Sequence, residues 1–378
     1  MTTTQKYAPI GQVEARIARL APRLYPQLPY HNWPHGSEVA EIMGKLSQVI
    51  GENEWEQACD RMAGWLHDGL YPYNAGEHEP FIAATSRRYL ERFGAAPDVV
   101  DRVGSTIEAS SHAGPLVKPY HHLMRAADLC KLAGPYDGFL TNWNNLREEA
   151  AILSGAKEVD PLAFNRGSVG FLGLFLKDTV RLTQNYYDTN GASAFHVAAM
   201  ANIIRRSQEV WKDAGGELRV VGEWGCGRYP VIIDHCSLAD PKVLFVGLEI
   251  DPVDLGFGLK AMGLANKFKK DHAPTGLILP GERHGISLPD NSLDELYLRN
   301  GWQKVRGSFP IKEMARVLKP GGVAKIIETY DPEGGLETGG NRSINLDQIQ
   351  ASFDQHGLRR VSLTELTDHG FCLVLSKS

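Results

Sequence analysis

The residues best suited to chemistry are imidazoles and carboxylates in the first half of the chain. They occur in four short segments: Tyr30-His31-Asn32-Trp33-Pro34-His35, Trp65-Leu66-His67-Asp68, Ser111-His112 and Arg125-Ala126-Ala127-Asp128. Imidazole and carboxylate ligands together suit divalent ions such as Fe, Mn, Zn, Ni or Mg. The sequence therefore predicts a site for one or two divalent ions.

The helical pattern around these residues indicates how they can meet. Apolar side chains recur at helical spacing in several stretches, notably 36–50, 54–67 and 120–133. His35 then opens a helix, His67 and Asp68 end one just before Gly69, and Asp128 lies within another. Adjacent side chains point apart in mid-helix, whereas the turn at a helix C-terminus lets them face one place. Three helices are therefore expected to converge on one ion.

The order of these residues resembles the HD superfamily of metal-dependent phosphohydrolases. The matching elements are His35, the pair His67-Asp68, and Asp128, and the resemblance covers roughly residues 25–150. It implies an all-α helical domain in which these four residues bind the metal. The Tyr-His-Asn-x-x-His form of the first segment is similar to that of the cyclic nucleotide phosphodiesterases, which implies that His31 is the general acid.

The resemblance also implies how the ester would be cleaved. A bound divalent ion lowers the pKa of its water and neutralises charge that develops on phosphate oxygens. Asp68 or Asp128 orients the attacking water, and His31 protonates the departing alkoxide. Arg125 and Lys131 flank Asp128 on its helix and are the expected partners of the phosphate.

A second ion and a different reaction remain open at this stage. HD proteins with two metals use further histidines between the His-Asp pair and the last Asp. His112 is the expected ligand of that kind, with His78-Glu79 as the other candidate. Some HD-fold proteins, such as myo-inositol oxygenase, hold two irons and oxidise a C–H bond. Six ligands would serve such a site: His35, His67, Asp68, His78, His112 and Asp128.

The second half of the chain changes character. Short apolar runs end in Gly or an acid, at 218–223, 243–249, 293–298, 323–328 and 371–376. Helix-like stretches alternate with them, such as 194–212, 253–265 and 310–318. This alternation predicts βαβ units around a mostly parallel sheet. The pattern breaks at 188–191, so the predicted domains are 1–190 and 191–378.

Two of these runs end in residues suited to a nucleotide-type ligand. The first ends in Glu223 and is followed by Gly225-Cys226-Gly227, where glycines let the backbone approach a ligand. The second ends in Glu249, and an acid at that place can accept both ribose hydroxyls.

The ordered motifs of this half resemble class I S-adenosylmethionine-dependent methyltransferases. The segments LPDNSLDELYL and EMARVLKPGG carry the resemblance, which covers about residues 190–378. It implies a Rossmann-like α/β fold that binds S-adenosylmethionine and methylates a small molecule. The implied cofactor residues are Glu223, Gly225, Cys226 and Gly227 at the methionine part, Glu249 at the ribose, and Glu282 and Arg283 near the adenine. Arg299 and Asn300 would end the fourth strand at the reaction centre.

One position departs from this pattern. Tyr229, followed by Pro230, stands where the family usually has a third glycine. An active methyltransferase, a degenerate fold that binds another ligand or a partner, and a cofactor-binding regulator therefore all remain open. The alternative to a hydrolase–methyltransferase fusion is a di-iron oxygenase with a degenerate methyltransferase-like binding module.

Composition bounds the remaining possibilities. The chain has 378 residues, 43% of them hydrophobic and 22% charged, which fits two or three ordinary globular domains. A net charge of −5 disfavours nucleic acid as a partner. The resemblance to the HD phosphohydrolases implies a small-molecule substrate, such as a nucleotide. No apolar run is long enough to span a membrane, and the N-terminus lacks the apolar core of a signal peptide. Five scattered cysteines without a CxxC pair fit a reducing, cytoplasmic location. We therefore predict a cytoplasmic, bifunctional enzyme.

Overall fold

A computed structural model describes most of the chain. The described residues are 7–71, 78–114, 116–176, 193–227, 242–249, 275–280, 285–299, 308–329, 346–367 and 370–378. They form two compact units that divide between Val159 and Asp160. The second unit thus begins earlier than the expected residue 191, because the helix Pro161–Leu176 packs against the sheet of that unit.

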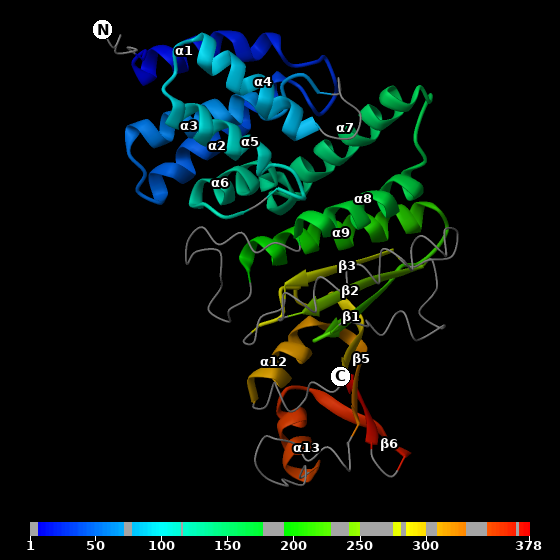
Figure 1. The fold of residues 1–378 in the computed structure, drawn as a ribbon. Helices are drawn as coiled ribbons and strands as arrows, with labels where there is room; N and C mark the ends of the chain where they lie inside the picture. Colours follow the sequence, from blue (N-terminus) through cyan, green and yellow to red (C-terminus); the bar gives the residue numbers. More distant parts are fainter. Residues whose placement is uncertain are drawn as a thin grey trace. The chain divides into compact units, whose positions relative to one another are not determined.

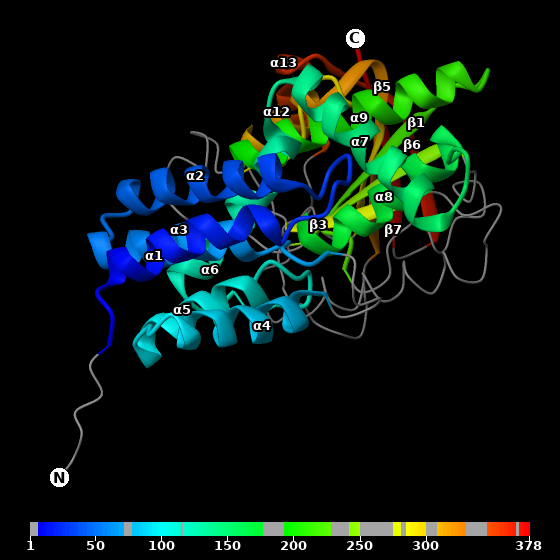
Figure 2. The ribbon, with the colours of Figure 1, turned by 90° about the horizontal axis from the view of Figure 1, so that it is seen from above.

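The described residues of the first unit are helical, without a strand (Figures 1 and 2). The α-helices are α1 (Ile10–Leu20), α2 (Trp33–Val49), α3 (Glu54–Leu66), α4 (His78–Arg92), α5 (Pro97–Glu108), α6 (Pro119–Asp128) and α7 (Tyr136–Ser154), with short 3₁₀ turns η1 (Ala21–Arg23) and η2 (Cys130–Ala133). Helix α2 packs along α3, and α4 along α5, as both views show.

Local sequence explains where the two central helices start. Asn32 caps α2 by accepting the backbone N–H of His35 at 3.1 Å, and Pro34 occupies the first turn, where no N–H is needed. Asn53 caps α3 in a reciprocal capping box with Glu56. Both caps fix the entry of helices that carry the predicted metal ligands.

The packing of α2 on α3 depends on a glycine. A Cβ at Gly64 would lie 2.5 Å from the Cα and 2.8 Å from the backbone N of Ala40, so only glycine allows this approach. Around the crossing lies one apolar core, which includes Val39, Met43, Met62, Leu66, Val103, Ile107 and Met124. Its burial stabilises the unit by roughly 1.5–3 kcal/mol per large side chain.

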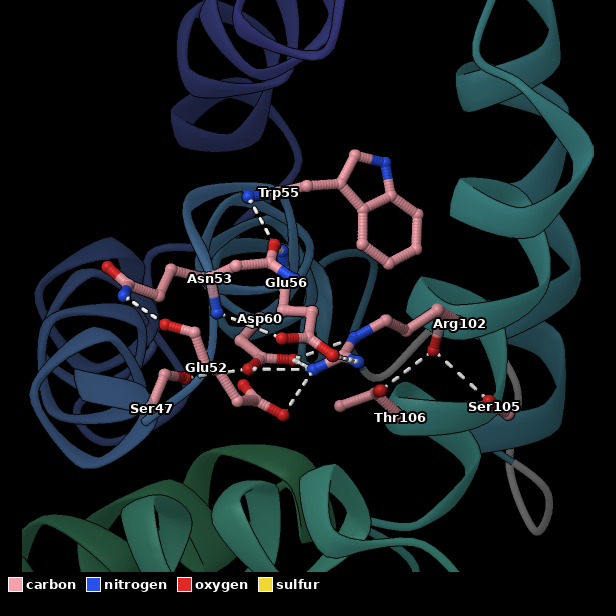
Figure 3. A network of polar contacts seen from close by, with 10 residues as sticks. Ser47, Glu52, Asn53, Trp55, Glu56, Asp60, Arg102, Ser105 and Thr106 are labelled. Atoms are coloured by element: carbon pink, nitrogen blue, oxygen red, sulfur yellow. Dashed lines mark hydrogen bonds and ion pairs between the residues drawn. The ribbon is translucent and has the colours of Figure 1, made fainter. Parts of the chain in front are cut away.

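A buried ionic cluster lies within the same helices (Figure 3). The fully buried carboxyl of Asp60 accepts the Ser47 hydroxyl at 2.6 Å and a guanidinium N–H of Arg102 at 3.0 Å. Arg102 also pairs with Glu52 at 2.7 Å, and its guanidinium lies 4.3 Å from the centre of the Tyr120 ring. The cluster ties α2, α3, α5 and α6 together through directional contacts.

The second unit is built on a seven-stranded sheet with the order β3-β2-β1-β4-β5-β7-β6. Its strands are β1 (Arg219–Trp224), β2 (Val243–Glu249), β3 (Thr275–Pro280), β4 (Leu293–Arg299), β5 (Leu318–Thr329), β6 (Leu358–Thr367) and β7 (Gly370–Lys377). Strands β3, β2, β1, β4 and β5 pair in parallel, and β7 is antiparallel to both β5 and β6. The described helices are α8 (Pro161–Leu176), α9 (Ala194–Asp213), α12 (Ser308–Val317) and α13 (Leu346–Gln355).

This arrangement confirms the predicted parallel sheet and is consistent with a Rossmann-like methyltransferase fold. The five expected strands are present as β1, β2, β4, β5 and β7, whereas β3 and β6 were not predicted. The helix expected at 253–265 lies outside the described residues. The order in which successive strands join the sheet reverses between β1 and β4, and such folds bind ligands in the crevice at this point.

Within the described part of the chain, no helix is both long and apolar enough to cross a lipid bilayer.

Candidate functional site

Four of the predicted metal ligands meet in the first unit. His35, His67, Asp68 and Asp128 each offer an atom, and these atoms lie within 4.8 Å of one another. His67 Nε2 is 2.9 Å from Asp68 Oδ2, and His35 Nε2 is 3.2 Å from the same oxygen. Asp128 Oδ1 lies 3.3 Å from His35 Nε2 and 3.6 Å from His67 Nε2. The residues come from α2, the end of α3, and α6, as the sequence predicted.

The protonation of His67 is fixed by its backbone partner. Its Nδ1 lies 2.8 Å from the carbonyl oxygen of Gly64, which can only accept, so Nδ1 carries the hydrogen. In the neutral imidazole, the Nε2 lone pair then faces carboxylate oxygens. Neither His67 Nε2 nor His35 Nε2 makes a hydrogen bond to any described residue, although both atoms are buried.

The electrostatics of this cluster also call for a cation. Burial lowers the pKa of His67, but Asp68 and Asp128 outweigh it and raise that pKa well above its usual range. Burial raises the pKa of Asp68, yet His67 and His35 hold it well below its ordinary value. The four groups act as one another's counter-ions. A divalent ion suits them because it replaces the protons on the imidazoles and is neutralised by both carboxylates.

His31 is held beside this cluster by a residue that the sequence did not indicate. Its Nδ1 pairs with Glu149 Oε1, and the other Glu149 oxygen accepts the backbone N–H groups of Tyr30 at 3.1 Å and His31 at 2.9 Å. Glu149 is buried on α7. The opposite ring nitrogen, His31 Nε2, lies 4.0 Å from Asp68 Oδ2 and therefore faces the proposed metal ligands.

A tight turn after α3 brings an aromatic ring onto His31. Leu70 has a φ of 72°, which is strained for a residue with a side chain. The next residue, Tyr71, stacks on His31 with ring centroids 3.9 Å apart. The ring centroid of His78 lies 4.8 Å from that of Tyr71. Glu149 and Tyr71 together restrict the imidazole of His31 to one orientation.

Two predicted phosphate partners lie elsewhere. Arg125 is fully buried and donates to the carbonyl oxygens of Ala109, at 3.1 Å, and of Ser111. It therefore supports the turn after α5, and its role as a phosphate partner stays a prediction. Lys131 pairs with Glu38 on α2 and is about one-third exposed, so its charge is already engaged.

The second-ion candidates do not join the four ligands. Among the described residues, the only grouping with ligand geometry is His35, His67, Asp68 and Asp128. His112, the expected ligand of a second ion, lies on the turn after α5 and is not a member of this grouping. The ring of His78 lies 4.8 Å from that of Tyr71 and is tilted against it by 45°. A second ion with His78 or His112 as a ligand therefore stays a prediction.

The second unit places charged residues at the carboxyl ends of neighbouring strands. Glu223, near the end of β1, is fully buried and accepts Arg299 Nε of β4 at 2.7 Å. Glu249, at the end of β2, accepts the backbone N–H of Gly227 at 2.6 Å. Gly225 and Gly227 have φ values of 72° and 60°, which explains the glycines of this turn.

One cofactor residue predicted here is turned away, and others are not described. Cys226 is buried in an apolar cluster with Val221 and Phe245, and burial raises the pKa of its thiol well above the usual range. Its side chain is therefore not a ligand contact, which corrects that assignment. Glu282, Arg283 and Asn300, like Tyr229, lie outside the described residues.

Comparison with known proteins gives likenesses of fold over part of the chain. No family model and no curated protein matches the sequence. A S-adenosylmethionine-dependent methyltransferase from Aquifex aeolicus is 16% identical, over 56% of this chain and 98% of that chain, with a TM-score of 0.35. A putative S-adenosylmethionine-dependent methyltransferase from Methanococcus maripaludis is 21% identical, over 45% of this chain and 82% of that chain, with a TM-score of 0.35. The [4+2]-cyclase SpnF is 15% identical, over 47% of this chain and 82% of that chain, also with a TM-score of 0.35. Such values say nothing about what this chain binds.

Proposed function

We propose that the first unit is a metal-dependent phosphohydrolase of the HD type that cleaves a phosphate ester of a small molecule, such as a nucleotide. The observation that carries this proposal is the convergence of His35, His67, Asp68 and Asp128, with two buried imidazole nitrogens left without hydrogen bonds. These residues would hold one divalent ion such as Fe, Mn, Zn, Ni or Mg. Such an ion supplies an activated water and charge neutralisation on the phosphate.

The surrounding residues have separable roles in this proposal. Asp68 and Asp128 would orient the attacking water through their carboxylate oxygens. Glu149 accepts the hydrogen on His31 Nδ1, which leaves Nε2 facing the ligand cluster as the atom that would deliver a proton. His31 is therefore the residue that would protonate the leaving oxygen. Tyr71 keeps the imidazole plane in place.

The test is elemental analysis of full-length protein purified without added metal and without oxygen, followed by assays on phosphate monoesters and diesters. Asp128→Ala is expected to lose the metal and turnover. His31→Ala is expected to keep the metal and lose turnover of esters with poor leaving groups. His112→Asn is the matched control and retains both. Metal retained in Asp128→Ala, or two irons with oxygen-dependent turnover, would refute the hydrolase.

We also propose that the second unit binds S-adenosylmethionine and methylates a small molecule. Support comes from Glu223 and Glu249, which lie at the ends of β1 and β2, and from the turn with Gly225 and Gly227 between them. These residues lie where the order of successive strands in the sheet reverses. These acids suit an ammonium group and a ribose diol. Calorimetry with S-adenosylhomocysteine tests the proposal, and no heat at millimolar ligand would exclude it.

A further inference from the structure

The carboxyl edge of the sheet in the second unit is electrically asymmetric. In the strand register Glu223 pairs with Gly247 of β2 and Tyr297 of β4, so Glu249 and Arg299 each lie two residues further along. All three charged side chains therefore lie on one face of the sheet. Two acids stand on the β2 and β1 side of the reversal point, and a guanidinium stands on the β4 side.

The middle of this row has no side chain. Gly225 follows β1 between the ends of β2 and β4, and a Cβ there would meet no described atom within 4 Å. Glu249 and Arg299 thus flank a glycine, with the buried carboxylate of Glu223 beneath it. A ligand seated over Gly225 would meet acids on one side and a cation on the other.

We propose that Arg299 recognises an acidic group, a carboxylate or a phosphate, on the acceptor that the second unit methylates. S-adenosylmethionine carries positive charge on its sulfur and its ammonium group, which the acids of β1 and β2 complement. The acceptor then occupies the β4 side. The inference rests on the proposed methyltransferase function and adds the chemical class of the acceptor.

The ion pair of Arg299 with Glu223 is compatible with this role. A guanidinium carries five N–H donors in a planar fork, so it can hold Glu223 through Nε and an oxyanion through its terminal nitrogens. The buried carboxylate fixes the direction of the fork before any ligand arrives. The side chain of Arg299 is 24% exposed, whereas that of Glu223 is fully buried. The cation is therefore the accessible member of the pair.

The test measures anion binding to full-length, metal-free protein saturated with S-adenosylhomocysteine. The probes are phenylphosphonate and benzoate, with neutral benzamide as the control, measured by isothermal titration calorimetry. At least one anion is expected to bind, and Arg299→Met is expected to weaken it about 10-fold or more. Binding of phenylphosphonate would indicate that the acceptor carries a phosphate, and binding of benzoate that it carries a carboxylate. Metal-free protein avoids anion binding by the ion proposed for the first unit.

Matched variants keep this test decisive. Arg219→Met removes another arginine that pairs with a glutamate, Glu295 at 3.1 Å, at the opposite end of the same sheet face, and should leave anion binding unchanged. The double variant Glu223→Gln/Arg299→Met removes both charges and covers the case in which an unpaired Glu223 prevents folding. Equal anion affinity in wild type and either Arg299 variant, or no anion binding in wild type, overturns the inference.

The cofactor itself supplies the last control. If Arg299→Met weakens S-adenosylhomocysteine but not 5′-methylthioadenosine, Arg299 holds the carboxylate of the cofactor, and the inference is wrong. If S-adenosylhomocysteine fails to bind wild type, the methyltransferase proposal fails. In that case anion binding that depends on Arg299 would still support the anion site.

Discussion

The close crossing of α2 and α3 at Gly64 gives the sharpest test of how the metal ligands are positioned. In Gly64→Ala the new methyl carbon would lie 2.5 Å from the Cα of Ala40, whereas carbon atoms in contact prefer about 3.5–4.0 Å. The neighbour is backbone on a helix, so no side-chain rotation relieves the overlap. The two helices must separate by about 1 Å.

The expected cost follows from two opposing effects. Overpacking in a well-packed core costs about 1–3 kcal/mol, and here the upper end applies because backbone is struck. Replacing glycine by alanine inside a helix stabilises the helix by about 1 kcal/mol. Gly64→Ala should therefore lower the free energy of unfolding by about 2 kcal/mol. Metal affinity should also fall, because His35 lies on α2 whereas His67 and Asp68 follow α3.

The assay compares this variant with Gly44→Ala, which changes a glycine of the facing helix α2. A Cβ at Gly44 would meet only the flexible side chain of Arg61, at 3.4 Å, so that variant should gain up to about 1 kcal/mol. Urea unfolding of metal-free protein gives the free energies, and competition with a chelator gives metal affinity. If both variants were equally stable and bound metal equally well, the argument that Gly64 sets the distance between the ligands would be refuted.

Three further predictions concern single residues. Burial, together with a hydrogen bond to Glu52, raises the pKa of Asp60 to about 8, so the native protein keeps a proton that the unfolded chain releases near pH 4. Wild type should therefore lose stability relative to Asp60→Asn as pH rises from about 4 to about 8, by up to about 1.4 kcal/mol per pH unit in urea unfolding; a constant difference would contradict this. Asn53→Ala removes the α3 cap and should cost about 1 kcal/mol in the same assay, and no change would show that the cap is dispensable. Glu149→Gln should leave metal content unchanged but slow cleavage of alkyl phosphate esters roughly 10–100-fold, more than that of p-nitrophenyl esters, whose leaving group needs no acid. Equal slowing of both would mean that Glu149 does not act through His31.

The sequence predicted the parts of the site that depend on helix geometry. A His-Asp pair at a helix end was expected to face one place, and the structure brings both side chains to His35 and Asp128. Most of the parallel strands could be predicted from the sequence because they are short apolar runs that end in Gly or an acid. The run of β3, Thr275–Pro280, ends in a proline and not in Gly or an acid, which weakens the signal of a strand.

Other parts depend on contacts that spacing does not specify. Glu149 was missed because α7 is rich in polar residues and was not predicted as a helix. Arg125 was assigned to phosphate because it lies near Asp128 in the sequence. A buried guanidinium needs acceptors, however, and the carbonyl groups after α5 provide them, since the end of a helix leaves carbonyls without intrahelical partners.

The placement of polar clusters along α2 and α6 has a consequence for how these helices can move. Helix α2 carries His35 near its start and Ser47 near its end, and α6 carries Tyr120 near its start and Asp128 at its end. Each helix is thus pinned at one end by the metal ligands and at the other by the cluster around Arg102. Apolar packing resists separation but permits sliding, whereas two directional anchors about 12–18 Å apart fix both rotation and axial register. A change at the Arg102 cluster is therefore expected to alter the spacing of the proposed metal ligands, although none of the residues of that cluster is a proposed ligand.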